Sequence, residues 1–179
     1  MDVKAAQASL DRALIVEAGA QADLIAGVSE PAGFRAAANL YWESYEQAPP
    51  ASYGRLVGML KAAVLGGGGE EEALRVRALL AHGGVSPTAW YAIGIAALIA
   101  GDDAQAMRAA DEIRGAGPAF ARAAAAMGAI ATCDDPAARA AIGAIEADFA
   151  SRDAHLTGVP IADTAVLFAT LRERRTRSS

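Results

Sequence analysis

The sequence is poor in the residues that build disulfides and metal sites. It contains one cysteine, Cys133, and two histidines. A single cysteine excludes an intramolecular disulfide and any metal site made from several cysteines. Because a chain of this length buries enough surface to fold without such cross-links, the composition predicts a globular protein of a reducing compartment, with no metal and no other cofactor.

Positive charge is scarce over most of the chain. The formal net charge is -5 and the pI is near 5.0. A surface that binds nucleic acid or anionic lipid needs a cationic field, so we expect neither nucleic acid nor a membrane as a partner. The segment 172–177 is the exception, because it carries +3 and leaves -8 for the rest of the chain.

The sequence also lacks a long apolar run. A membrane-spanning helix needs roughly 20 predominantly apolar residues. The uncharged stretch 85–101 is shorter than that and contains a Ser-Pro-Thr sequence. The first residues include Asp2 and Lys4 and do not resemble a signal peptide. We therefore expect a cytoplasmic protein.

Helical patterns fill the sequence instead. Hydrophobic residues make up 54% of the chain but aromatic residues only 6%, and much of the difference is alanine, which favours helices packed at close range. Apolar residues recur every three or four positions, and no segment shows the alternation of a strand. The pattern predicts an all-α fold of about eight or nine helices in a single domain, 1–175, followed by a frayed tail, 176–179. Proline and glycine mark the ends of the expected helices, which cover 3–28 (as one helix or two), 32–47, 51–65, 70–82, 88–100, 103–114, 119–133, 137–152 and 161–174.

Bulky and small residues follow a regular spacing from Trp90 onward. Gly94 comes four positions later, Gly101 seven after that, Ala106 five later and Pro118 twelve later. This spacing resembles a tetratricopeptide repeat. The resemblance implies that Gly94 and Ala106 lie where the two helices of a hairpin cross, and that Gly101 takes a left-handed turn.

A second unit follows less clearly at 119–152. The shift along the chain that maps Gly94 onto Gly128 also maps Ala106 onto Ala140, although it maps Trp90 onto an alanine. The resemblance therefore predicts a right-handed, α-solenoid-like stack of antiparallel helix hairpins.

In proteins of this kind the first helix of each hairpin lines a concave surface that holds a peptide or a partner's helix. The resemblance places a mostly apolar set of side chains there, with an arginine near each edge. Such a lining suits an amphipathic helix, and an arginine suits a carboxylate of the partner. Alternatively, the chain's own N-terminal helix fills this groove. The candidate partner-binding residues are Arg55, Met59, Thr88, Tyr91, Ile95, Ile99 and Arg122.

Polar residues gather before and within the first turn of the last expected helix. They are His155, Thr157, Asp163 and Thr164. Asp163 suits the positive end of a helix, and Thr157 suits the capping of exposed amides. Alternatively, these residues form a small site in which His155 acts as a base, because the pKa of a free imidazole is close to neutrality.

The sequence thus predicts a protein-interaction or adaptor module that binds a partner protein or peptide. Two alternatives from other classes stay open. One is a small enzyme or ligand-binding protein that uses the region 153–164, and the other is a structural subunit whose apolar groove forms a homodimer interface.

Overall fold

The computed structural model describes residues 2–28 and 30–178, and this part of the chain is helical without any strand. Within each of the two compact units described below, consecutive helices pack against one another, as in an α-solenoid-like stack. The prediction of an all-α fold is therefore confirmed. The helices are α1 (Val3–Ile25), α2 (Pro31–Gln47), α3 (Gly54–Leu65), α4 (Glu70–Leu79), α5 (Pro87–Ala100), α6 (Asp103–Arg114), α7 (Pro118–Ala131), α8 (Asp135–Ala150) and α9 (Asp163–Ser178).

Local sequence explains where the helices begin. Proline opens α2, α5 and α7, where its missing N–H is not needed by the helix. The side chain of Ser86 accepts a hydrogen bond from the Ala89 amide at 3.2 Å and caps α5. The carboxylate of Asp102 caps α6 in the same way by accepting from the Gln105 amide at 3.1 Å.

Several helix boundaries differ from the predicted ones by a few residues, including those of the first and last helices. The N-terminal pattern forms one helix, α1, which ends at Ile25. At the other end, α9 continues through Thr176 and Arg177, which the sequence analysis assigned to a frayed tail. Three arginines just before this extension, Arg172, Arg174 and Arg175, form ion pairs that are described below. Ser179 lies outside the described residues.

The described residues group into two compact units. Unit 1 contains the helices up to Gly69 and the segment Arg152–Ile161, and unit 2 contains Glu70–Ser151 and the segment from Ala162 onward. The single domain expected for 1–175 stays a prediction, and each unit is described by itself.

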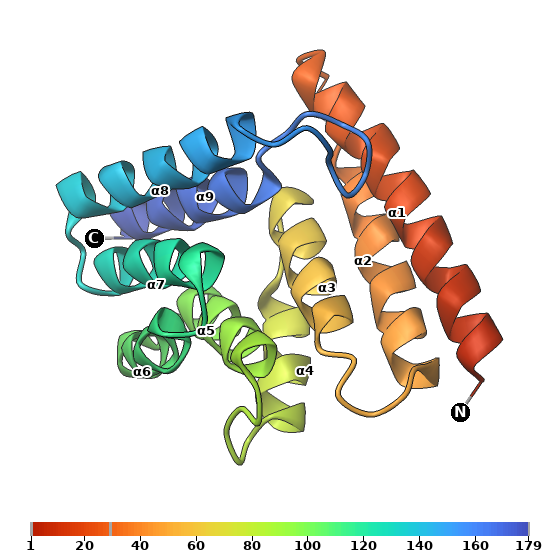
Figure 1. Ribbon diagram of the computed structural model, residues 1–179, viewed down its shortest axis with the longest axis horizontal. Coiled ribbons are helices and arrows are strands. Elements are labelled where there is room, and N and C mark those ends of the chain that lie inside the picture. The colour runs from red at the N-terminus through yellow and green to blue at the C-terminus, as the bar shows by residue number, and fades with distance from the viewer. Residues whose placement is uncertain (1, 29, 179) are drawn as a thin grey trace. The chain divides into compact units, whose positions relative to one another are not determined.

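Unit 1 is a row of three helices in which α2 packs against both α1 and α3 (Figure 1). Polar side chains cross this row. The Tyr41 hydroxyl donates to the buried Glu17 carboxylate at 2.5 Å, and the Ser44 hydroxyl donates to the Ala6 carbonyl at 2.6 Å. These bonds fix α2 against α1 at two levels of the helix pair.

Unit 2 is built from α4 to α9. Each of these helices packs against the next, and α5 also contacts α7, as α7 contacts α9; Figure 1 shows α8 and α9 side by side. Small residues let the helices approach closely. The fully buried alanines of this unit include Ala92, Ala96, Ala97, Ala106, Ala109, Ala110, Ala124 and Ala126.

Gly94 lies at a close crossing of helices, although its neighbours differ from those expected. A Cβ atom at Gly94 would overlap the Met127 thioether of α7 and would lie 3.0 Å from the Ala109 Cβ of α6, so the nearest atoms belong to these residues and not to Ala106. A Cβ at Gly128 would have only the Met107 sulfur within reach, at 3.7 Å. The two glycines are therefore not equivalent, which corrects the repeat register that aligned them.

Candidate functional site

The C-terminal helix covers part of the surface that the sequence analysis assigned to a partner. The Tyr91 ring of α5 packs edge-on against Phe120 of α7, with ring centroids 6.1 Å apart, and lies 6.4 Å from the Phe168 ring of α9. Phe168 and Ile95 have no exposed surface. Ile95 therefore belongs to the core of unit 2, and the prediction that it lines an open groove is wrong because the surface around it is already packed.

The Tyr91 hydroxyl is enclosed as well. Burial raises its pKa far above the usual range, the nearby Asp163 carboxylate raises it further, and Thr164 lowers it slightly. Because both residues begin α9, the start of that helix lies against this tyrosine. Among the described residues, no group meets the Tyr91 hydroxyl in regular hydrogen-bond geometry.

The other predicted contact residues have several different environments. Arg122 forms an ion pair with Asp148 of α8, and Thr88 lies half-buried in the first turn of α5. In unit 1, the Arg55 guanidinium donates to the Ser44 hydroxyl at 2.7 Å, and Met59 is completely buried. Met59, like Ile95, is a core residue and not an exposed contact, because packed helices enclose it.

The polar residues near the C-terminus are divided between the two units. His155 and Thr157 belong to unit 1, where the Thr157 hydroxyl donates to the Gln21 side-chain oxygen at 2.6 Å. Asp163 and Thr164 belong to unit 2, where they begin α9. Gln21 is buried, so Thr157 satisfies a buried polar group, which is a structural role.

Three turns, those before α4, α6 and α8, share one backbone geometry. Gly67, Gly101 and Cys133 each have a positive φ, of 82°, 73° and 55°. After each of them, the next amide bonds back to a carbonyl five positions earlier, as in a Schellman motif. Cys133 occupies a position that favours glycine, at a cost of roughly 1–2 kcal/mol.

An acidic residue begins the helix after each of these turns, and each pairs with an arginine of α9. Arg172 pairs with Asp135 at the start of α8, Arg175 with Asp103 at the start of α6, and Arg174 with Glu70 at the start of α4. A carboxylate at a helix N-terminus is already favoured by the helix dipole. We call these three pairs the arginine ladder, because they connect α9 to α4, α6 and α8.

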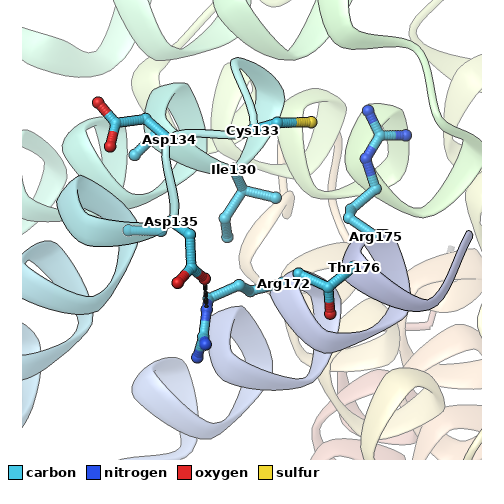
Figure 2. A pocket seen from close by; sticks show the side chains of 9 residues that line it. Ile130, Cys133, Asp134, Asp135, Arg172, Arg175 and Thr176 are labelled. Atoms are coloured by element: carbon cyan, nitrogen blue, oxygen red, sulfur yellow. Dashed lines mark hydrogen bonds and ion pairs between the residues drawn. The ribbon is translucent and has the colours of Figure 1, made fainter. Parts of the chain in front are cut away.

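A first cavity, of about 250 Å³, lies beside the Cys133 turn (Figure 2). Figure 2 shows the bond from Arg172 to Asp135 in its wall and the Cys133 thiol directed toward the side where Arg175 lies. The hydrogen bond from Arg172 is the main reason that the pKa of Asp135 is lowered; slight desolvation opposes it, and Arg139 adds to it.

A second cavity, of about 430 Å³, lies where α5 ends and also has Arg175 in its wall. Ile99 lies half-buried in its lining, so this predicted contact residue, unlike Ile95, reaches an accessible space. Apolar groups form one part of the lining, and arginines of α9 form another. We call this space the Ile99 cavity; it is lined by Glu70, Leu98, Ile99, Ala100, Gly101, Leu171, Arg174, Arg175 and Arg177.

Comparisons with protein-family models, with curated proteins and with solved structures find no match for this chain. Within the part of the chain that the structure describes, His, Cys, Asp and Glu side chains do not gather in threes where they could hold a metal ion. None of the described helices combines the length and the apolar character that crossing a membrane requires.

Sequence reasoning missed the arginine ladder, although the sequence contains a signal for it. The triplets 69–71 (GEE), 101–103 (GDD) and 133–135 (CDD) recur at one constant interval. They mark the turns that precede α4, α6 and α8. A search for turn residues followed by paired acids finds this interval, whereas the alignment of Gly94 with Gly128 gave a slightly longer one.

Proposed function

We propose that this protein is a protein-interaction module that binds a segment of a partner protein at the Ile99 cavity. The observation that carries the proposal is the position of Ile99, which is half-buried in the lining of an accessible cavity with arginines beside it. The hairpin packing of unit 2 supplies a rigid frame for such a site, and the resemblance to tetratricopeptide repeats supports the same class of function.

The cavity has the properties of an anchor site. Its volume of about 430 Å³ lies within the range of pockets that bind compact ligands. Leu98 and Leu171 are almost fully buried, so they give the floor a fixed shape. Burying one large apolar side chain of a partner there contributes about 1.5–3 kcal/mol. Interfaces commonly depend on a few such anchors.

The alternatives from the sequence have less direct support. In the alternative polar site, the Thr157 hydroxyl donates a hydrogen bond to the buried Gln21 side chain, which is a structural role. The apolar inner surface proposed for a homodimer is covered around Tyr91 and Ile95. The partner-binding proposal instead uses a surface that remains accessible.

Site-specific photo-crosslinking tests this function in the full chain. A benzoylphenylalanine placed at Ile99 is expected to give a discrete adduct with a partner protein, and excess native chain should suppress it by competition. Leu74, an exposed apolar residue of the same unit, provides the matched control position. The captured protein is then purified, and its affinity for the native chain is compared with that for the Ile99→Ser variant.

The native chain should bind the purified partner about tenfold more tightly than Ile99→Ser does, because the substitution removes an apolar contact from the lining of the cavity. Adducts that form equally at Leu74, or an affinity that Ile99→Ser leaves unchanged, would contradict the proposal. Far-ultraviolet circular dichroism of each variant confirms that it remains helical.

A further inference from the structure

The three arginines that border the Ile99 cavity are engaged to different degrees. Arg175 is paired with Asp103, and its guanidinium would lie 3.1 Å from a Cβ atom at Gly101, so it also touches the C-terminal end of α5. Arg174 is 3.6 Å from the Glu70 carboxylate, a long contact to a side chain that is 72% exposed. Arg177 is exposed and has no ion pair among the described residues.

The balance of charge at this cavity is opposite to that of the chain. The charges of Arg174, Arg175 and Arg177, summed with those of Glu70 and Asp103, give a net charge of +1 at the cavity. The whole chain has a net charge of -5. Because Glu70 pairs with Arg174 and Asp103 pairs with Arg175, the remaining positive charge is that of Arg177. A local patch of this sign attracts acidic groups and repels basic ones, within about 10 Å at 0.1 M salt.

We propose that the Ile99 cavity selects an acidic segment of the partner, in which one large apolar side chain is flanked by Asp or Glu. This inference rests on the proposed function and names the chemistry of the partner. The apolar side chain fills the floor formed by Leu98, Ile99 and Leu171. The flanking carboxylates pair with Arg177 and Arg174, whose planar guanidinium groups can each bind a carboxylate through two hydrogen bonds.

The orientation of the segment follows from the end of α5. The last carbonyl groups of a helix carry a partial negative charge, so a carboxylate is disfavoured beside residues 98–101 and an apolar group is tolerated there. The carboxylates of the partner therefore lie on the α9 side of the cavity. The ion pair between Arg175 and Asp103 is retained and fixes this wall of the cavity. A carboxylate of the partner replaces the exposed Glu70 as the ion-pair partner of Arg174.

Selection from a phage library of random peptides tests this chemistry without knowledge of the natural partner. The native full chain is immobilised at low salt, and the enriched peptides are sequenced, synthesised and titrated by fluorescence anisotropy. We expect enrichment of Leu, Ile or Phe flanked by Asp and Glu. Their affinity should fall about tenfold in Arg177→Glu and also fall as salt is raised.

The matched control is Arg114→Glu, which makes the same change of charge at an exposed arginine of α6 that does not line the cavity. It should leave the affinity within about twofold of the native value, because it adds only a distant, screened charge. Thermal melting of both variants confirms that each folds.

Enrichment of neutral or basic peptides, no enrichment, or equal binding by Arg177→Glu and the native chain would each overturn the acidic preference. These outcomes leave the proposed function standing if the adduct at Ile99 and the effect of Ile99→Ser are still found. Conversely, acidic peptides that bind the native chain while no adduct forms at Ile99 would contradict only the protein-partner function.

Discussion

The two units hold their helices together with different chemistry. In unit 1 the polar side chains Ser9, Glu17, Gln21 and Ser44 are buried between helices. In unit 2, by contrast, every described residue classed as buried has an apolar side chain or is glycine, and the ion pairs lie at the helix ends. Buried hydrogen bonds fix the register of a helix pair, whereas close packing of alanines fixes the distance between helices. The units should therefore respond differently to substitution.

A charge placed inside unit 2 is expected to have the largest effect. Ile95→Asp puts a carboxylate at a position with no exposed surface and an apolar surrounding. An uncompensated buried charge costs about 3–5 kcal/mol, so unit 2 should lose its cooperative unfolding or melt at a much lower temperature. Thermal denaturation followed by circular dichroism measures the change. A native-like melting temperature would show that this position is open to solvent.

Removal of one hydroxyl should have an intermediate effect in unit 1. Tyr41→Phe leaves the ring in place but takes away the hydrogen bond that the buried Glu17 accepts. The free energy of unfolding should fall by about 1–3 kcal/mol, as for other buried groups that lose a partner. Urea denaturation measures it. Tyr45→Phe is the control, because Tyr45 is half-buried with its ring stacked on Trp42, and its effect should stay below about 0.5 kcal/mol.

Acid should weaken the ion pairs of the arginine ladder, and we expect this to have the smallest effect on stability of the three predictions. The pKa of Asp135 is lowered in the folded state from its usual value of 3.8, so its contribution to stability is present above that pH. The contribution is lost as the pH falls below 3.8 through the folded-state pKa. The difference in melting temperature between native protein and Arg172→Gln should therefore shrink as the pH falls below about 4.

Arg139→Gln serves as a graded control for the acid experiment. Arg139 also pairs with Asp135, but its side chain is 61% exposed and it lowers the pKa less than Arg172 does. Its effect on the melting temperature should have the same direction and be smaller. A difference that is independent of pH for both variants would show that Asp135 does not couple to either arginine.

Local features were predicted well from the sequence because local chemistry determines them. Proline at the start of α5 and the left-handed Gly101 were both predicted, and both act within one turn of the chain. Each of these features could be predicted from the residues next to it in the sequence. The all-α fold follows from the same signals, repeated along the sequence.

Long-range features were harder to predict. The alanine-rich composition allowed small residues to be aligned at an interval longer than the one at which the acidic triplets recur. The covering of Tyr91 by Phe168 joins residues far apart in the chain, and no periodic pattern connects them. The candidate site was therefore recovered only in part. Ile99 was predicted as a contact residue, whereas Arg174, Arg175 and Arg177 were not.

The contact between Arg174 and Glu70 has a consequence for how the protein is made. Glu70, at the start of α4, leaves the ribosome long before Arg174, with which it forms an ion pair. Synthesis runs from the N-terminus to the C-terminus, so the arginine ladder of unit 2 cannot form until α9 has left the exit tunnel of the ribosome. Until then the nascent chain exposes the surface around Tyr91 that Phe168 later covers, and chaperones can engage it during that interval.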